Sequence, residues 1–123
     1  MRGYLIATAV VSLLASACSH VPHEREINGF VVGHTYELRV RTPLLSHGSR
    51  HSLGLPPDGD RNPPIGTEMI RWVPPGTTVR VVRICREETL TRGSICWPAG
   101  LLDNGLEIGL GRRGLRRLFA VPR

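Results

Sequence analysis

Three cysteines carry the most reactive side chains of this 123-residue sequence. Cys18 follows a run of small residues, whereas Cys85 and Cys96 lie in the second half of the chain with ten residues between them. A cysteine thiolate can form a disulfide, bind a metal or act as a nucleophile. The spacing of the cysteines helps to separate these uses. Because their number is odd, at least one cysteine has a role other than an intramolecular disulfide.

Arginine and tryptophan provide the candidate binding chemistry. Four guanidinium groups lie within six residues near the C-terminus, those of Arg112, Arg113, Arg116 and Arg117. Arginine binds phosphate and carboxylate bidentately, so this cluster predicts an anion-binding surface; the alternative is a solvated strand edge that resists aggregation. Trp97 precedes a proline near an expected strand end. It is a candidate for stacking on a sugar or a peptide, the alternative being packing in the core.

The sequence has no convincing motif for catalysis or metal binding. We find no nucleophile elbow, zinc-hydrolase helix or glycine-rich phosphate loop. Glu87 and Glu88 are adjacent, so in a strand they would point to opposite faces and could not act as an acid–base pair. His47 and His51 have a spacing that aligns two imidazoles only on a helix, and the DGDRN segment at 58–62 lacks the glycine and glutamate of a calcium loop. We predict no enzyme activity, no metal and no cofactor.

The first 17 residues have the organisation of a secretory signal peptide. Arg2 supplies a positive charge, the eleven residues 4–14 are apolar and uncharged, and the small residues Ala15, Ser16 and Ala17 follow. A transmembrane helix needs about 20 apolar residues, so this run is too short to be one. We expect residues 1–17 to be removed on export.

The segment LASAC, which ends at Cys18, resembles the lipobox of bacterial lipoproteins. The resemblance covers residues 1–18 and implies that the Cys18 thiol becomes a thioether to a diacylglyceryl group, with its freed amine acylated, for example by palmitate. Ala15 stands where such motifs favour leucine. The alternative is ordinary cleavage after Ala17, which leaves Cys18 as a free or intermolecular thiol. Ser19 in place of aspartate implies an outer-membrane anchor that faces the periplasm.

Given a lipidated Cys18, the two remaining cysteines form an even pair in an oxidising compartment. We therefore expect a structural disulfide between Cys85 and Cys96. The segment between them is polar and contains a glycine, which is typical of a loop joining neighbouring strands. A redox-active pair or a metal site would favour the closer C-x-x-C spacing.

The charge of the chain favours anionic partners in the envelope. All 16 basic residues are arginine and 10 residues are acidic, which gives a net charge of +6. Removal of Arg2 with the leader leaves 15 against 10, or +5. This balance suits contact with peptidoglycan, lipopolysaccharide or an envelope protein, and together with export it argues against a nucleic-acid partner.

Alternating residues predict an all-β domain. Tyr36, Leu38 and Val40 share one face of a strand at 36–42, and Ile70 and Trp72 share one face at 67–73. The strand at 77–85 is either buried on both sides or bulged. Pro and Gly in PPGT predict a hairpin turn between these last two strands. Three shorter strands are expected at 94–97, 106–110 and 117–121.

Five to six short strands predict a small SH3-like barrel or a compact sandwich stapled by one disulfide. VPPGTTVRVVRI resembles the hairpin of bacterial SH3-like barrels. Residues 18–28 read as a flexible tether, 29–123 as one domain, and 43–66 as a long loop. We expect a non-catalytic binding or assembly module of the cell envelope. The alternatives are an accessory subunit of an envelope complex and an enzyme inhibitor that uses the 43–66 loop.

Overall fold

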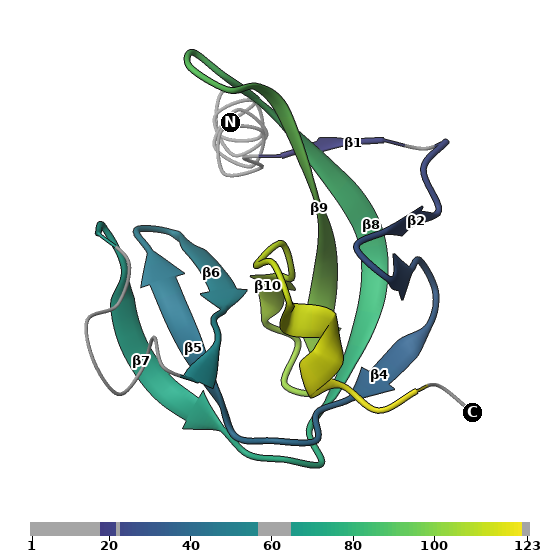
Figure 1. Cartoon of the computed structure of the whole chain (residues 1–123), viewed down its shortest axis with the longest axis vertical. Helices are drawn as coiled ribbons and strands as arrows, with labels where there is room; N and C mark the ends of the chain where they lie inside the picture. Colours follow the sequence, from purple (N-terminus) through teal and green to yellow (C-terminus); the bar gives the residue numbers. More distant parts are fainter. Residues whose placement is uncertain (1–17, 22, 57–64, 122–123) are drawn as a thin grey trace, which may run out of the picture.

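The protein is built from β-strands, as the sequence predicts. The computed structural model describes residues 18–21, 23–56 and 65–121 (Figure 1). The strands are β1 (Ser19–His20), β2 (Glu26–Ile27), β3 (Phe30–Val31), β4 (Thr35–Glu37), β5 (Thr42–His47), β6 (Arg50–Leu53), β7 (Glu68–Val73), β8 (Thr78–Thr89), β9 (Gly93–Leu102) and β10 (Glu107–Gly109). A 3₁₀ turn, η1 (Leu115–Leu118), follows the last strand.

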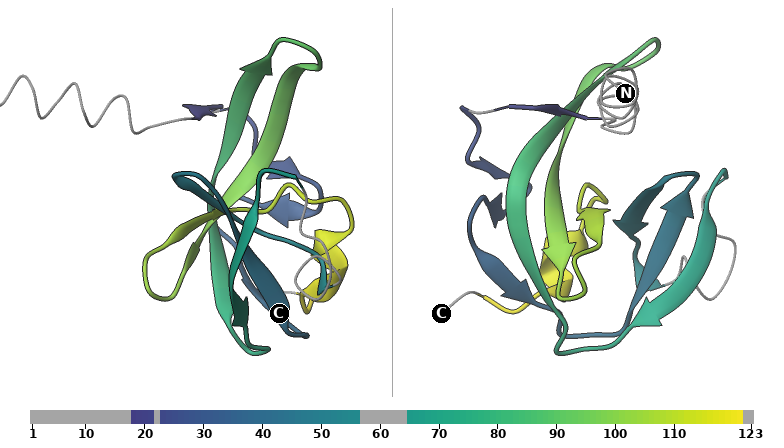
Figure 2. Two further views of the ribbon diagram at one scale, coloured as in Figure 1. Left: turned by 90° about the vertical axis from the view of Figure 1, so that its left-hand side faces the viewer. Right: turned by 180° about the vertical axis from the view of Figure 1, so that it is seen from behind.

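Eight of these strands form one curved sheet that stays open. Its order is β1-β8-β9-β10-β6-β5-β7, and β4 also pairs with β8, while β2 and β3 form a separate ribbon. β10 and β6 are parallel, and the other neighbouring strands are antiparallel. The long β8–β9 hairpin extends past the rest of the sheet at one end, where β1 crosses it (Figure 2). The all-β prediction is therefore confirmed, with a sheet that does not close into a barrel.

The PPGT turn forms, but the hairpin predicted around it does not. Gly76 has a φ of 90°, which glycine adopts without strain, and Thr77 donates from its N–H to the Pro74 carbonyl at 3.3 Å. β7 then pairs with β5, and β8 pairs with β4 and β9. The backbone of Leu38 takes the place of a hairpin partner, because it accepts from the Gly76 N–H and donates to the Thr77 carbonyl at 2.8 and 2.9 Å.

These contacts with the turn also shorten the strand predicted at 36–42. Tyr36 and Leu38 are buried as expected, at 2% and 1% exposure, but β4 ends at Glu37. Val40 lies outside β4, and 41% of it is exposed. The alternation was correct for the first half of the segment, and the chain bends before the second half.

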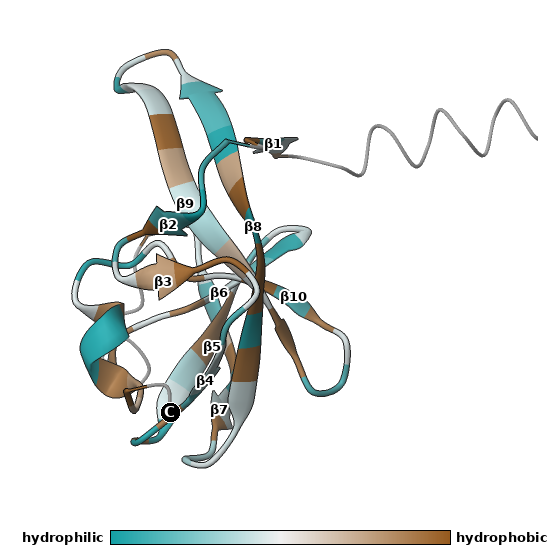
Figure 3. Ribbon diagram, turned by 90° about the vertical axis from the view of Figure 1, so that its right-hand side faces the viewer, coloured by the Kyte–Doolittle hydropathy of each residue, from teal (hydrophilic) through white to brown (hydrophobic). Residues whose placement is uncertain are grey.

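Two β-bulges change the pairing of the long strands. In β7 the register passes from Arg71 to Met69, which leaves Ile70 as the extra residue, 48% exposed. In β8 the register passes from Val81 to Arg83, so Val82 is extra. The second of the two alternatives for 77–85, a bulged strand, is therefore the correct one. Apolar and polar stretches alternate along β8 (Figure 3).

The segment 43–66 is not one long loop. Its first part forms the hairpin of β5 and β6, in which His47 pairs with Arg50 and only Gly48 and Ser49 form the turn. The φ of Gly48 is 67°, as a two-residue hairpin with glycine at its first corner requires. Residues 57–64, which include the whole DGDRN segment at 58–62, lie outside the described residues.

Both ends of the domain also differ from the prediction. The segment 18–28 contains β1 and β2. β1 pairs with β8, and the Val21 N–H donates to the Ile84 carbonyl at 3.1 Å, so residues 19–21 lie on the sheet where a flexible tether was predicted. The strand predicted at 117–121 is replaced by η1 and by a single bridge between Phe119 and Leu38. The core gathers around the edge-to-face rings of Phe30, Tyr36 and Phe119, whose centroids lie 5.1 to 6.3 Å apart.

The disulfide joins Cys18 to Cys85, with 5.2 Å between their Cα atoms, and Cys96 is a half-buried free thiol. The predicted Cys85–Cys96 bond is therefore wrong, and the register explains why. Cys85 lies opposite Trp97, whereas Cys96 lies opposite Arg86. Residues that face each other across an antiparallel ladder share a side, so Cys85 and Cys96 point to opposite faces of the sheet.

Replacing Cys18 with serine in the chain without its leader should lower the free energy of unfolding by about 4 kcal/mol, because the bond closes a loop with a sequence separation of 67. Cys96→Ser is the matched control, since both side chains are partly exposed, and it should change stability by less than about 0.5 kcal/mol. Urea unfolding of oxidised samples measures both values. The reverse result, with Cys96→Ser the destabilised variant, would mean that Cys85 pairs with Cys96.

Candidate functional site

Two adjoining hollows open on one face of the sheet and meet at Trp97. The first, the disulfide hollow, measures about 340 Å³ and is bordered by Cys18, Arg83, Cys85 and Glu107. The second, the tryptophan hollow, measures about 420 Å³ and is bordered by His47, Ser52, Glu87, Cys96 and Arg112. Both are lined by Arg50, His51, Trp97 and Gly109. Their sizes fall within the range of about 300–1,000 Å³ that is usual for ligand pockets.

Strand register brings the polar side chains of this face together. Cys85 lies opposite Trp97, Glu87 opposite Ile95, and Arg83 opposite Ala99, so all six share one side of the β8–β9 hairpin. The same side continues through β10 to β6, because Gly109 pairs with both Ala99 and Ser52. Side chains from three separate parts of the sequence therefore border the same hollows.

Trp97 lies against glycine backbone. A Cβ added at Gly111 would come within 2.9 Å of the Trp97 Cβ, and one added at Gly109 would lie 3.5 Å from its ring. The absence of side chains at these two positions lets the indole lie close to the chain. The guanidinium carbon of Arg50 lies 5.7 Å from the ring centroid, within the range of a cation–π contact. Trp97 is thus half-buried in the wall of both hollows, and neither wholly in the core nor fully exposed.

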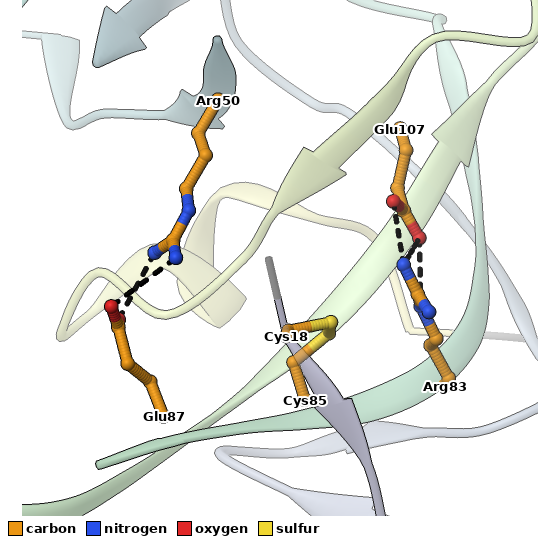
Figure 4. Close-up of a disulfide and its surroundings, with 6 residues drawn as sticks. All are labelled: Cys18, Arg50, Arg83, Cys85, Glu87 and Glu107. Atoms are coloured by element: carbon orange, nitrogen blue, oxygen red, sulfur yellow. Dashed lines mark hydrogen bonds and ion pairs between the residues drawn. A yellow bond between two sulfur atoms is a disulfide. The ribbon is translucent and has the colours of Figure 1, made fainter. Parts of the chain in front are cut away.

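Two ion pairs border the disulfide on either side (Figure 4). Arg50 donates to both carboxylate oxygens of Glu87, at 3.0 and 3.2 Å, and Arg83 donates to both oxygens of Glu107, at 2.9 and 2.8 Å. The four side chains keep between 28% and 43% of their surface exposed, so each pair contributes little to stability. Their two-point geometry instead fixes the direction of each guanidinium.

Three of the four arginines predicted to bind anions surround a third hollow. This arginine hollow measures about 380 Å³ and is lined by Asn28, Gly111, Arg112, Arg113, Gly114 and Arg116 together with Leu115. Arg117 is exposed and does not line it. Arg112 and Gly111 also border the tryptophan hollow, so Trp97 and the arginine cluster belong to adjoining sites.

Arg116 has a structural role that the sequence did not indicate. Its Nε and Nη1 donate to the carbonyls of Gly29 and Phe119 at 3.1 and 3.2 Å. Its guanidinium carbon lies 4.8 Å from the ring centroid of Tyr36. Arg116 therefore holds η1 against the aromatic core. Arg112 and Arg113 are exposed residues that line the hollow.

Sequence reasoning missed Arg50, Arg83 and Glu107, and it considered His51 only as a metal ligand. The signal that was available is the dipeptide Gly48-Ser49, which is typical of a two-residue hairpin turn and would have placed Arg50 and His51 on a strand. His47 and His51 lie on opposite sides of that hairpin, since His47 pairs with Arg50 and His51 with Ser46. Within the described parts of the chain, no three metal-binding side chains cluster.

No family model, curated protein or solved structure matches this chain. Across residues 18–21, 23–56 and 65–121, no helix is long and apolar enough to cross a membrane.

The pKa of His47 reflects the electrostatics of the site. Partial burial, followed by the positive Arg50 and by His51, holds the pKa of the His47 imidazole below its usual value of 6.5. Its Nε2 lies 2.7 Å from the Ser52 hydroxyl. The unfolded chain takes up a proton on His47 at a higher pH than the folded chain does. The contribution of His47 to the free energy of unfolding is therefore fully present above about pH 6.5. This contribution falls as the pH drops from about 6.5 to the pKa that His47 has in the folded chain.

Replacing Arg50 with glutamine should raise the pKa of His47 part of the way back, because burial, the larger cause, remains. A proton NMR titration of the imidazole measures the change. Arg71→Gln, on β7, is the control and should leave the titration unchanged. An identical His47 curve in wild type and Arg50→Gln would mean that Arg50 does not act on this group.

Proposed function

We propose that this chain is an exported lipoprotein, anchored through Cys18 at the outer membrane and facing the periplasm, whose domain binds an anionic glycan of the cell envelope without catalysing a reaction. The observation that carries this proposal is that the arginine hollow adjoins the tryptophan hollow at Gly111 and Arg112. The stacking residue and the anion-binding residues predicted separately from the sequence are thereby neighbours.

The charges around the three hollows favour an anionic ligand. Their walls contain five arginines, Arg50, Arg83, Arg112, Arg113 and Arg116, against two glutamates, Glu87 and Glu107. Guanidinium groups recognise carboxylate and phosphate, and a half-buried indole offers an apolar surface for a sugar ring. A lipopolysaccharide phosphate and a peptidoglycan carboxylate both have this chemistry.

The two carboxylates of the site are paired with arginines, which supports a binding role. Glu87 accepts both hydrogen bonds from Arg50, and Glu107 accepts both from Arg83. The inhibitor alternative depended on a plug formed by the 43–66 loop. Residues 43–53 of that segment form a hairpin that lines the hollows, which favours a binding wall over a free plug for this part of the segment.

The lipid anchor and the disulfide compete for one sulfur. A thioether at Cys18 excludes its bond to Cys85, so a lipidated chain would leave Cys85, which is 1% exposed in the disulfide-bonded structure, as a thiol. Cys96 cannot replace Cys18, because it points to the other face of the hairpin. Two or more acyl chains are enough for stable anchoring.

Mass spectrometry of the protein extracted from membranes tests the anchor. We expect an N-terminal peptide that begins with a lipid-modified Cys18 and a separate peptide with Cys85 as a free thiol. A mature chain that starts at Cys18 and retains the Cys18–Cys85 disulfide would contradict the anchor, and would instead favour ordinary cleavage after Ala17.

Binding to isolated envelope polymers tests the glycan proposal. The full chain, expressed with its leader and purified in detergent, is incubated with peptidoglycan sacculi and with lipopolysaccharide across a salt series. Retention should fall with salt, and Arg112→Ser with Arg113→Ser should weaken it about tenfold, or ~1.4 kcal/mol. The charge-matched control is Arg71→Ser with Arg92→Ser, which lies away from the hollows. Equal loss in both double variants, or no retention by wild type, would reject the proposed site.

A further inference from the structure

The turn of the β8–β9 hairpin presents an apolar side chain to its surroundings. Leu90 lies in this turn and is fully exposed, at 106%. Thr89 closes the turn, because its hydroxyl donates to the Gly93 carbonyl at 2.8 Å and accepts from the Arg92 N–H at 3.0 Å. The turn therefore has a fixed shape that holds Leu90 away from the rest of the protein. We call residues 89–93 the hairpin tip.

We propose that the hairpin tip inserts into the surface of the phospholipid bilayer that holds a lipidated Cys18, with Leu90 among the acyl chains and Arg92 among anionic headgroups. The inference rests on the lipid anchor of the proposed function and adds a second contact between the domain and the membrane. Leucine beside a basic residue suits this boundary, because the apolar side chain leaves water while the cation stays close to the headgroups.

The lipid attachment point lies on the same hairpin, close to its tip. β1 pairs with β8, which places Ser19, the residue after Cys18, opposite Arg86. This pairing is made by the main chain, so a thioether on the Cys18 sulfur removes none of its hydrogen bonds. Three residues of β8 separate Arg86 from Thr89, which is about 10 Å at ~3.3 Å per residue. A bilayer that takes up the acyl chains is therefore within reach of the hairpin tip.

The hairpin tip projects from one end of the molecule, past the other strands (Figure 2). The other end of β8 begins at Thr78, which pairs with Glu37 of β4. The Glu37 carbonyl accepts from the Ala120 N–H at 2.8 Å. Val121, which is 81% exposed, follows directly and so lies far from the hairpin tip along β8. A bilayer at the tip would not reach it.

Ion pairs leave a positive charge at the hairpin tip. On this part of the hairpin, Glu87 pairs with Arg50 at 3.0 Å and Glu88 pairs with Arg86 at 3.2 Å. Among the residues that the structure describes, Arg92 has no acidic partner. A guanidinium that no carboxylate neutralises favours a bilayer with anionic headgroups over a zwitterionic one.

Fluorescence quenching by brominated lipid tests the contact. Leu90→Trp and its control Val121→Trp are expressed with the leader, purified in detergent and reconstituted in vesicles of phosphatidylethanolamine and phosphatidylglycerol, with or without bromine on the acyl chains. After subtraction of the wild-type signal of Trp72 and Trp97, bromine should remove about half of the emission of Leu90→Trp and leave that of Val121→Trp unchanged. Equal quenching of the two variants would reject the contact at the hairpin tip.

Hydrogen exchange tests the native leucine, because tryptophan itself favours membrane interfaces. In the same vesicles without bromine, the amides of the hairpin tip should exchange severalfold more slowly in wild type than in Leu90→Ser, after correction for intrinsic rates. The β9–β10 turn at 103–105 is the internal reference, since it follows Leu102, which lies opposite Val79 near the other end of β8. It should exchange equally in both chains. Equal exchange at the hairpin tip as well would overturn the proposal.

Flotation of these vesicles separates the inference from the proposed function. If wild type floats with the vesicles but its hairpin tip is neither quenched nor protected, the lipid anchor stands and the contact at the tip is wrong. If wild type does not float, the anchor and the contact at the tip are both rejected, while binding to sacculi still decides the glycan proposal.

Discussion

The arrangement of this molecule depends on the β-bulge at Val82. Before the bulge, Val79 and Val81 lie opposite Leu102 and Gly100 and are fully buried. In an unbroken strand, Arg83 and Cys85 would continue on that same face and enter the core. The extra residue reverses the alternation, so Ile84 is buried on the core side while Arg83, Cys85 and Glu87 share the other side with Trp97. One inserted residue thus separates the core half of β8 from the half that borders the hollows.

Glycine positions determine how closely the neighbouring strands approach this centre. A Cβ at Gly100 would collide with the Val79 side chain and come within 3.2 Å of Leu110, so the core at this point requires its absence. Gly109 and Gly111 have the corresponding role on the other face, where Trp97 lies against them. Close packing therefore requires glycine on both faces of the sheet, at Gly100 in the core and at Gly109 and Gly111 beside Trp97.

The arginines divide into those that build the structure and those that remain at its surface. Arg116 caps the aromatic cluster of Phe30, Tyr36 and Phe119 and bonds two backbone carbonyls. Arg50 and Arg83 are held by glutamates in the walls of the hollows. A cluster of guanidiniums in the sequence consequently overstates the charge available to a ligand, because packing and ion pairs occupy part of it.

Local patterns in the sequence were enough to predict the all-β class, the strand at 77–85 and the turn at 74–77. Period-two alternation and the backbone preferences of Pro and Gly act over a few residues, so they need no knowledge of the partners. The partners of Cys85, the hairpin of β5 and β6, and the meeting of Trp97 with Arg112 came only from the tertiary structure. Each depends on register between strands distant in the sequence, and a shift of one residue moves a side chain to the opposite face. Which cysteine reaches Cys85, and which arginines surround a hollow, are for this reason properties of the folded sheet.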